Sequence, residues 1–319
     1  MRPYLEDIRR RLAAKYREVY LTLDLLRGRL APGPDATTRA PRPENIVWIF
    51  GSGRSGSTWL RSMMGEMERH RVWEEPMVGR LFGSFHENAQ QGQLNSASFI
   101  MGEPTRKGWI RSIRNFVLDG ARYAQPKLGL DDYLVVKEPN GSMGAPLLME
   151  ALPESRMILL VRDPRDVVSS VLDGARKGSW LYEWGEKGGW KENALADADP
   201  DGFVKRRART YLHHAGAAKR AYDGHEGPKT LIRYEELRTD TLAVMRRVYD
   251  ELGMSVDEHS LQRAVEKHSW ENIPREKKGE GKFYRRGSSG GWREDLTPEQ
   301  AKAVERITAP LLAEFYPAT

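Results

Sequence analysis

The sequence contains no cysteine. Disulfide bonds, thiolate nucleophiles and cysteine-bound zinc are therefore excluded, and nothing indicates an oxidising compartment. Long apolar runs are also missing, since none approaches the roughly 18 residues that a membrane-spanning helix needs. The N-terminus, residues 1–7, lacks the apolar segment of a secretory signal. These absences predict a soluble, cytoplasmic protein.

Charge of one sign is not strongly in excess. The 319 residues include 51 Lys and Arg against 45 Asp and Glu, for a net charge of +6. So small an excess is compatible with an anionic ligand but argues against nucleic acid as the partner. The seven histidines show no metal-ligand spacing, and His213 and His214 are adjacent, so they point to different helix faces. We therefore expect no metal site.

Residues 4–30 have helical periodicity, because apolar side chains recur at spacings of three and four. The series is Leu5, Ile8, Leu12, Tyr16, Val19, Leu23 and Leu26. We interpret it as an amphipathic helix that packs on its own domain or, in a homodimer, on a second subunit; a basic helix on a membrane surface is the alternative. Residues 31–44 are rich in Pro and polar residues and predict a linker. The predicted organisation is an N-terminal helix and linker over 1–44 and one large domain over 45–319.

Four short apolar runs predict strands that are buried on both faces of a parallel sheet. They lie at residues 46–50, 134–136, 157–161 and, more weakly, 230–232. Helical stretches are expected at about 57–69, 144–151, 164–177, 203–222, 239–252 and 297–315. Strands that alternate with helices predict an α/β protein with three layers, in which helices flank a central parallel sheet.

A glycine-rich turn, residues 51–59, directly follows the first predicted strand and opens a helix. Converging backbone N–H groups and the helix dipole make such a turn an anion site. Gly51 and Gly56 have the spacing of the nucleotide-triphosphatase loop, but Ser57 stands where that loop has its lysine. The cation here is Arg54, inside the loop. The sequence therefore predicts a phosphate site that differs from that of a kinase.

A second motif follows the third predicted strand. Asp163 is a good helix N-cap, and Pro164 suits the first helical position. Arg162 then lies at the carboxyl edge of the sheet, where ligands bind in open α/β folds. Ser170 follows eight positions later, two turns into the helix and on the face of Asp163. Arg162 is therefore a candidate ligand-binding residue.

These motifs resemble those of sulfotransferases that use 3′-phosphoadenosine 5′-phosphosulfate (PAPS). The loop matches the family's 5′-phosphosulfate pattern, P-[KR]-S-G-[ST]-[ST]-x, with Gly53 in place of the usual proline. The matching residues are Arg54, Ser55, Gly56, Ser57, Thr58 and Trp59. Arg162 and Ser170 match the arginine and serine that grip the 3′-phosphate in the family. The resemblance covers about residues 45–295 and implies a P-loop-type fold with PAPS as the donor and no metal.

Two further segments resemble family elements. Residues 283–292 are similar to the closing loop F-x-R-K-G-x-x-G-x-W, which implies that Phe283, Arg285, Arg286 and Gly287 complete the 3′-phosphate pocket. Tyr234 stands in a Y-E-[DE]-L element, whose tyrosine lies by the adenine in the family. Trp59 is the other candidate for adenine contact. Both aromatic residues could equally belong to the core.

The resemblance also implies roles in catalysis. Arg54 neutralises the bridging oxygen as its bond to sulfur breaks, and Lys137 corresponds to the family lysine that helps hold the leaving phosphate. A general base must take the acceptor's proton. Cytosolic members have K-x-H at this strand end, but here Glu138 and Pro139 follow Lys137. The chain is thus more similar to the carbohydrate- and tyrosine-modifying members, which use a glutamate base, and the candidates are Glu75, which we favour, and Glu138.

Two other functions compete with sulfuryl transfer. A P-loop kinase of a small molecule needs the loop lysine and a magnesium carboxylate, and the loop has no lysine. A non-catalytic nucleotide-binding or scaffold protein would keep Arg162 and Ser170 but need no base. The acceptor is a hydroxyl or amine of a small molecule, carbohydrate or lipid. Its pocket is expected in the stretches 76–130 and 178–205.

Overall fold

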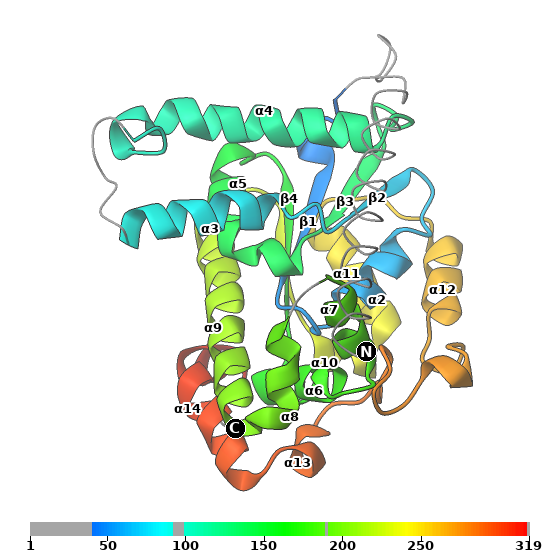
Figure 1. Cartoon of the computed structure of the whole chain (residues 1–319). Helices are drawn as coiled ribbons and strands as arrows, with labels where there is room; N and C mark the ends of the chain where they lie inside the picture. The colour runs from blue at the N-terminus through cyan, green and yellow to red at the C-terminus, as the bar shows by residue number, and fades with distance from the viewer. Residues whose placement is uncertain (1–39, 92–98, 189–190, 318–319) are drawn as a thin grey trace, which may run out of the picture. The chain divides into compact units, whose positions relative to one another are not determined.

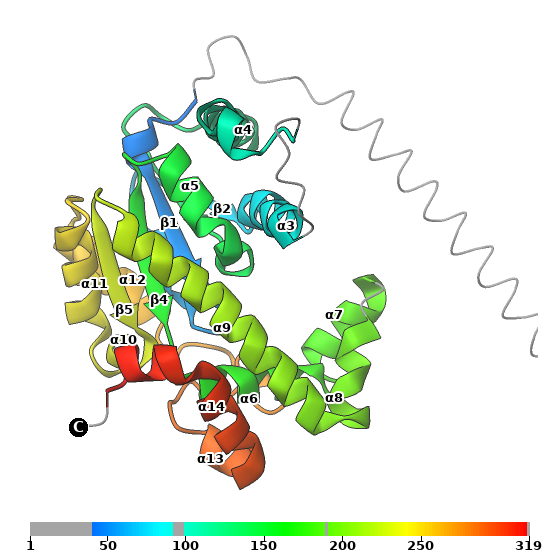
Figure 2. The same ribbon diagram turned by 90° about the vertical axis from the view of Figure 1, so that its left-hand side faces the viewer.

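The structure, a computed structural model, describes residues 40–91, 99–188 and 191–317. Five strands form one parallel sheet in the order β2-β3-β1-β4-β5, seen near its edge in Figure 2. The strands are β1 (Ile46–Gly51), β2 (His70–Glu74), β3 (Tyr133–Lys137), β4 (Arg156–Val161) and β5 (Lys229–Arg233). Because all five run the same way, their carboxyl ends meet at one edge of the sheet.

Helices cover both faces of this sheet (Figures 1 and 2). The first face carries α2 (Ser57–Met64), α10 (Tyr234–Thr239), α11 (Thr241–Glu251) and α12 (Glu258–Lys267). The second carries α4 (Arg106–Ala124), α5 (Ala145–Ala151) and α9 (Pro200–Gly224). The remaining helices are α3 (Val78–Gln91), α6 (Pro164–Ala175), α7 (Trp180–Gly188), α8 (Leu195–Ala198), α13 (Trp292–Asp295) and α14 (Pro298–Phe315). The predicted three-layer α/β fold with a central parallel sheet is thus confirmed.

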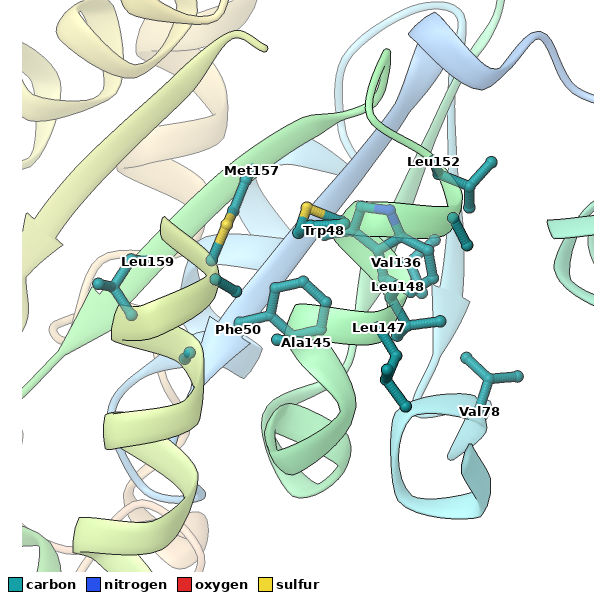
Figure 3. Packing of buried hydrophobic residues seen from close by; sticks show 14 of the residues in the cluster. Trp48, Phe50, Val78, Val136, Ala145, Leu147, Leu148, Leu152, Met157 and Leu159 are labelled. Carbon is teal, nitrogen blue, oxygen red and sulfur yellow. The ribbon is translucent and has the colours of Figure 1, made fainter. Parts of the chain in front are cut away.

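A hydrophobic core lies on each face of the sheet, and the side chains of β1 point alternately into the two cores. All residues of β1 are buried. Trp48 and Phe50 point to the second face, where their rings stack 5.4 Å apart beside Leu148 (Figure 3). Val47 and Ile49 point to the first face. Since successive strand residues face opposite sides, an unbroken apolar run is what a strand between two helical layers requires.

The ends of the helices follow local sequence. Asp163 caps α6 by accepting a hydrogen bond of 2.8 Å from the amide of Arg165, with Pro164 in the first position. Thr297 and Gln300 cap α14 reciprocally. The predicted helix at 57–69 ends earlier, at Met64.

Some predicted features need correction, and others stay predictions. The edge strand β2 and the helices α3 and α4 were not predicted individually, because His70–Glu74 is too polar to stand out and the region 76–130 showed no clear pattern. The predicted N-terminal helix and most of the linker lie outside the described residues. In the part of the chain that the structure describes, no helix is long and apolar enough to cross a membrane. The cytoplasmic location, the domain boundary and the homodimer stay predictions.

Candidate active site

The glycine-rich loop connects β1 to α2 at the carboxyl edge of the sheet. Gly56 has φ of 99°, and a Cβ there would lie 2.6 Å from the ring of Tyr234, so only glycine fits. Among the described residues, no acceptor takes the amides of Gly56, Ser57 and Thr58. Unpaired amides at a helix N-terminus form an anion site.

Arg54, inside this loop, reaches across to α6. Its Nε donates to Ser170 Oγ at 3.1 Å, and its Nη2 donates to the carbonyl of Phe283 at 2.6 Å. The guanidinium also lies 4.7 Å from the Phe283 ring centre and 5.2 Å from that of Trp180. Burial, followed by the charge of Arg162, lowers the pKa of Arg54 to about 10. Arg54 therefore stays charged at neutral pH and lies beside the predicted 3′-phosphate serine.

Arg162 leaves the end of β4 and stacks 4.2 Å from the ring centre of Tyr234. Its Nη1 donates to the carbonyl of Arg54 at 3.2 Å, and its Nη2 donates to that of Ser288 at 3.1 Å. Its Nε is buried and has no hydrogen-bond partner among the described residues. An unpaired buried donor on a cation is costly, so this geometry suits an anionic ligand.

The closing loop is fastened by ion pairs to α6 and to α13. Arg285 lies 2.6 Å from Asp295 and 3.3 Å from Asp173, and it donates to Ser169 Oγ at 2.9 Å. Arg286 lies 2.6 Å from Glu294. Both arginines already have carboxylate partners, so a phosphate would have to compete for them.

A cavity joins these parts, and its empty space of about 900 Å³ includes space that is open to solvent. The predicted donor-site residues that line it are Arg54, Gly56, Ser57, Thr58, Trp59, Arg162, Ser170, Tyr234, Phe283, Arg285, Arg286 and Gly287. Gly53 and Ser55 do not line it, and the fully buried Ser55 hydroxyl donates to the carbonyl of Ser52 at 2.7 Å.

Aromatic side chains form one wall of the cavity. Trp59 and Tyr234 meet edge to face, with ring centres 6.2 Å apart. Trp59 is held by a hydrogen bond of 2.8 Å from its Nε1 to the carbonyl of His268, and Arg238 lies 5.8 Å from its ring centre. Both rings predicted to contact adenine thus border the cavity that is also lined by residues of the glycine-rich loop (51–59), called the phosphate loop from here on.

A second polar cluster lies at the end of β3. Lys137 is only 5% exposed, and its Nζ donates to Glu74 at 2.8 Å and to Glu75. The second carboxylate oxygen of Glu75 accepts from Asn140 Nδ2 at 2.6 Å. Asn140 Oδ1 would lie 3.1 Å from a Cβ on Gly53. This cluster therefore borders the phosphate loop.

Glu138 has a different environment from its neighbour Lys137. Its side chain is completely buried, and its two carboxylate oxygens accept from the amides of Met77 at 3.0 Å and Gly79 at 3.1 Å. Burial raises the pKa of Glu138 to about 7. This carboxylate is thus engaged with the start of α3, and it makes no hydrogen bond to Lys137.

Three residues of this cluster were not predicted. Glu74 stands opposite Lys137 in the register of β2 and β3, and Arg61 of α2 pairs with Glu74 at 2.6 Å. The polarity at the end of β2 could have indicated Glu74, whereas no sequence signal indicated Asn140. The described residues hold no group of three or more His, Asp or Glu that could bind a metal.

Known proteins resemble this chain in sequence. A family model described as the sulfotransferase family matches residues 47–258. Sulfotransferase 2A1 of Rattus norvegicus is 23% identical over 233 residues, covering 66% of this chain and 76% of the rat protein. Carbohydrate sulfotransferase 2 of Mus musculus is 27% identical over 184 residues, covering 51% of this chain and 35% of the mouse protein.

Two solved structures share the fold. Mouse sulfotransferase SULT7A1, complexed with PAP, has a TM-score of 0.51 at 12% identity, with 88% of this chain and 90% of that chain covered. Sulfotransferase STF9 of Mycobacterium avium has a TM-score of 0.50 at 16% identity, with 89% and 79% covered. At such low identities the likeness concerns the fold alone.

Proposed function

Because the chain belongs to the sulfotransferase family and is a sulfotransferase enzyme, we propose that it transfers a sulfuryl group from PAPS to a hydroxyl or amine. The observation that carries this proposal is the single cavity that gathers the phosphate loop, Arg162, Ser170 and the aromatic wall. The proposed acceptor is a small molecule, a carbohydrate or a lipid.

The donor site fits a nucleotide with two phosphate-bearing ends. The unpaired amides of Gly56, Ser57 and Thr58 suit the 5′ end, and the unpaired Nε of Arg162 together with Ser170 suits a 3′-phosphate. When bound, PAPS supplies an activated sulfuryl group. The residues of this chain hold its charges and orient the group that leaves.

Arg54 is proposed to neutralise charge on the bridging oxygen of the donor. The support is its place inside the loop and its charge, which survives burial because the lowered pKa of about 10 is still well above neutrality. The role requires the guanidinium to exchange its bond to Ser170 for one to the leaving phosphate. Lys137, which also borders the loop through Glu75 and Asn140, is proposed to assist it.

Glu75 is the proposed general base. Its carboxylate lies beside the phosphate loop, partly exposed, between Lys137 and Asn140. It takes the proton of the acceptor group while the new bond to sulfur forms and the bond from sulfur to the bridging oxygen breaks. Glu138 is buried and engaged with two backbone amides, so we assign it no proton transfer.

A thermal-shift comparison tests the donor assignment. Adenosine 3′,5′-bisphosphate (PAP), the product of PAPS, should stabilise the protein more than ATP with Mg²⁺, because Ser57 replaces the lysine that a kinase loop uses on ATP. Stronger stabilisation by ATP with Mg²⁺ would favour the kinase alternative.

Release of PAP from PAPS then tests the transfer. The protein is incubated with PAPS and a panel of phenols, aliphatic alcohols, sugars and amines. Acceptor-dependent release supports sulfuryl transfer and names the acceptor class. Stabilisation by PAP without release, even in a cell extract of acceptors, would favour the non-catalytic nucleotide-binding alternative.

A further inference from the structure

The turn that carries Glu75 has an unfavourable backbone. Glu75 has φ of 42° and Met77 has φ of 60°, and neither is glycine. Left-handed conformations are uncommon for such residues and persist only where the surroundings hold them. Something in the fold must therefore keep this turn, with Pro76 between the two residues, in place.

The buried side chain of Glu138 holds this turn in place. It is 0% exposed, and its carboxylate accepts from the amide of Met77 at 3.0 Å and from that of Gly79 at 3.1 Å. One of these amides belongs to the strained turn and the other to the first turn of α3. A carboxylate with two acceptor oxygens is the side chain best suited to bind both.

The segment that contains Glu138 is itself attached to β1. The amide of Glu138 donates to the carbonyl of Ile49 at 3.0 Å, and the amide of Gly51 donates to Ser142 Oγ at 3.0 Å. Glu138 immediately precedes the short helix η3 (Pro139–Gly144), and Ser142 lies within it. Glu138 and η3 are thus hydrogen-bonded to β1, the strand that precedes the phosphate loop.

Close backbone packing completes the attachment of α3. Gly79 and Gly141 are in backbone contact, and a Cβ on either would collide with its neighbours. The same absence of a side chain at Gly141 leaves room for the Glu138 carboxylate. The start of α3 therefore has little freedom to shift along η3.

Asn140, the second residue of η3, holds the carboxylate of Glu75 itself. Its Nδ2 donates to Glu75 at 2.6 Å, and its Oδ1 stands next to Gly53 of the phosphate loop. Glu75 is thus held twice from the same short segment, once through the backbone of its turn and once through its carboxylate.

We propose that Glu138 and Asn140 are positioning residues, a bracket that sets the place of Glu75 relative to the phosphate loop. This inference rests on the proposed role of Glu75 as the base. Because both residues belong to one segment that is bonded to β1, the base and the loop share a common support. Misplacement of a catalytic group by about 1 Å can cost roughly 10²-fold in rate, so the bracket acts on turnover rather than on donor affinity.

A double-mutant cycle measures whether Glu138 acts through Glu75. Glu138→Gln keeps the shape but points an amide NH₂ at a backbone N–H, which loosens the turn. The comparison is made above pH 7, where Glu138 is a carboxylate. We expect turnover, measured as PAP release from PAPS, to fall roughly 10- to 100-fold in the wild-type background. In the Glu75→Gln background the same change should cost less than about 3-fold, since residues that act as a unit are not additive. The affinity for PAP should stay unchanged in both.

Asn140→Ala provides a second variant for the same cycle. Asn140 is only partly buried, so its loss should disturb the fold less than a change at Glu138. We expect a similar loss of turnover that likewise vanishes in the Glu75→Gln background. The matched control is Asp240→Asn, which changes a carboxylate that caps α11 through the amide of Ala243, and which should leave turnover unaltered.

Hydrogen exchange supplies a readout that needs no acceptor. In Glu138→Gln the peptide covering residues 75–83 should exchange faster, while a peptide from α6 should not change. Equal losses of turnover in both backgrounds, or unchanged exchange at 75–83, would overturn the bracket. Full turnover in Glu75→Gln alone would instead overturn the base assignment, and the two failures are therefore distinguishable.

Discussion

The proposed donor side, with Arg54 and Arg162, and the proposed acceptor side, with Lys137, Glu74 and Glu75, arrange their charges in opposite ways. On the donor side, Arg54 and Arg162 make no ion pair within the described residues, and they bond only to carbonyls and a hydroxyl. On the acceptor side, Lys137 is buried between two carboxylates. Uncompensated cations attract an anion, whereas a balanced cluster does not. The first arrangement suits a charged ligand, and the second suits proton exchange with a neutral group, as the proposed function requires.

The two basic segments of the proposed donor side, Arg162 and the closing loop (283–292), also differ in how their charges are compensated. The Nε atoms of Arg162 and Arg285 are both buried without a hydrogen bond among the described residues. Arg162 also has no ion pair there, whereas Arg285 and Arg286 are neutralised by Asp173, Asp295 and Glu294. We therefore expect Arg162 to contribute more to the binding of a 3′-phosphate than either arginine of the closing loop.

The largest expected effect concerns the base on the acceptor side. Glu75→Gln should lower turnover by roughly 10²- to 10⁴-fold, because the amide keeps the shape but cannot take a proton. Affinity for PAP, measured by calorimetry, should not change. The control is Glu154→Gln, which removes a surface ion pair with Arg114 and should keep full activity. A parallel loss of PAP affinity in Glu75→Gln would mean that the two sides are not separate.

The next effect is a pH dependence of stability that originates on the acceptor side. Burial raises the pKa of Glu138 from 4.5 to about 7, so between these values the folded protein holds a proton that the unfolded chain releases. The free energy of unfolding should therefore decrease as pH rises from about 4.5 to 7, by at most about 3 kcal/mol, and stay level above that range.

Urea unfolding at several pH values in wild type and Glu138→Gln measures this contribution. In the variant, the free energy of unfolding should lack the decrease between about pH 4.5 and 7 that Glu138 causes. Burial lowers the pKa of His214 to about 4, which acts in the opposite sense, so the difference between the two proteins is the informative quantity. Identical slopes would show that Glu138 titrates at its ordinary value.

A smaller effect is expected for the donor side. Arg162→Ala should weaken PAP binding by about 1.5–3 kcal/mol, the scale of a charged hydrogen bond, while adenosine 5′-monophosphate should bind almost as before. Arg285→Ala should lose less, because phosphate competes there with Asp173 and Asp295. Equal losses for both nucleotides would place Arg162 away from the 3′-phosphate.

The smallest expected effect is that of removing divalent metal. The loop has Ser57 in place of the kinase lysine, and its cations are side chains, so EDTA should change neither the stabilisation by PAP nor the release of PAP from PAPS. A marked loss of activity in EDTA that Mg²⁺ restores would overturn the prediction of a metal-free reaction.

Sequence patterns predicted which elements carry the proposed donor-side residues, because the parts of this region are local in the sequence. A strand, a glycine turn and a helix start follow one another over residues 46–64, and Arg162 and Ser170 lie on one strand–helix unit. The hydrogen bonds and ion pairs between these parts could not be predicted from the sequence. Nothing in the sequence indicated that Arg54 would reach Ser170 or that Asp173 would hold the closing loop.

The sequence by itself determined the layers of this protein and the place of the phosphate loop, because strand burial and turn geometry depend on neighbouring residues. Only the tertiary structure decided which glutamate accompanies Lys137. Glu138 follows Lys137 directly, yet its carboxylate is taken by the start of α3. Glu75 is 62 positions away but arrives beside Lys137 because β2 pairs with β3, and strand pairing is set by the packing of the whole sheet rather than by either segment.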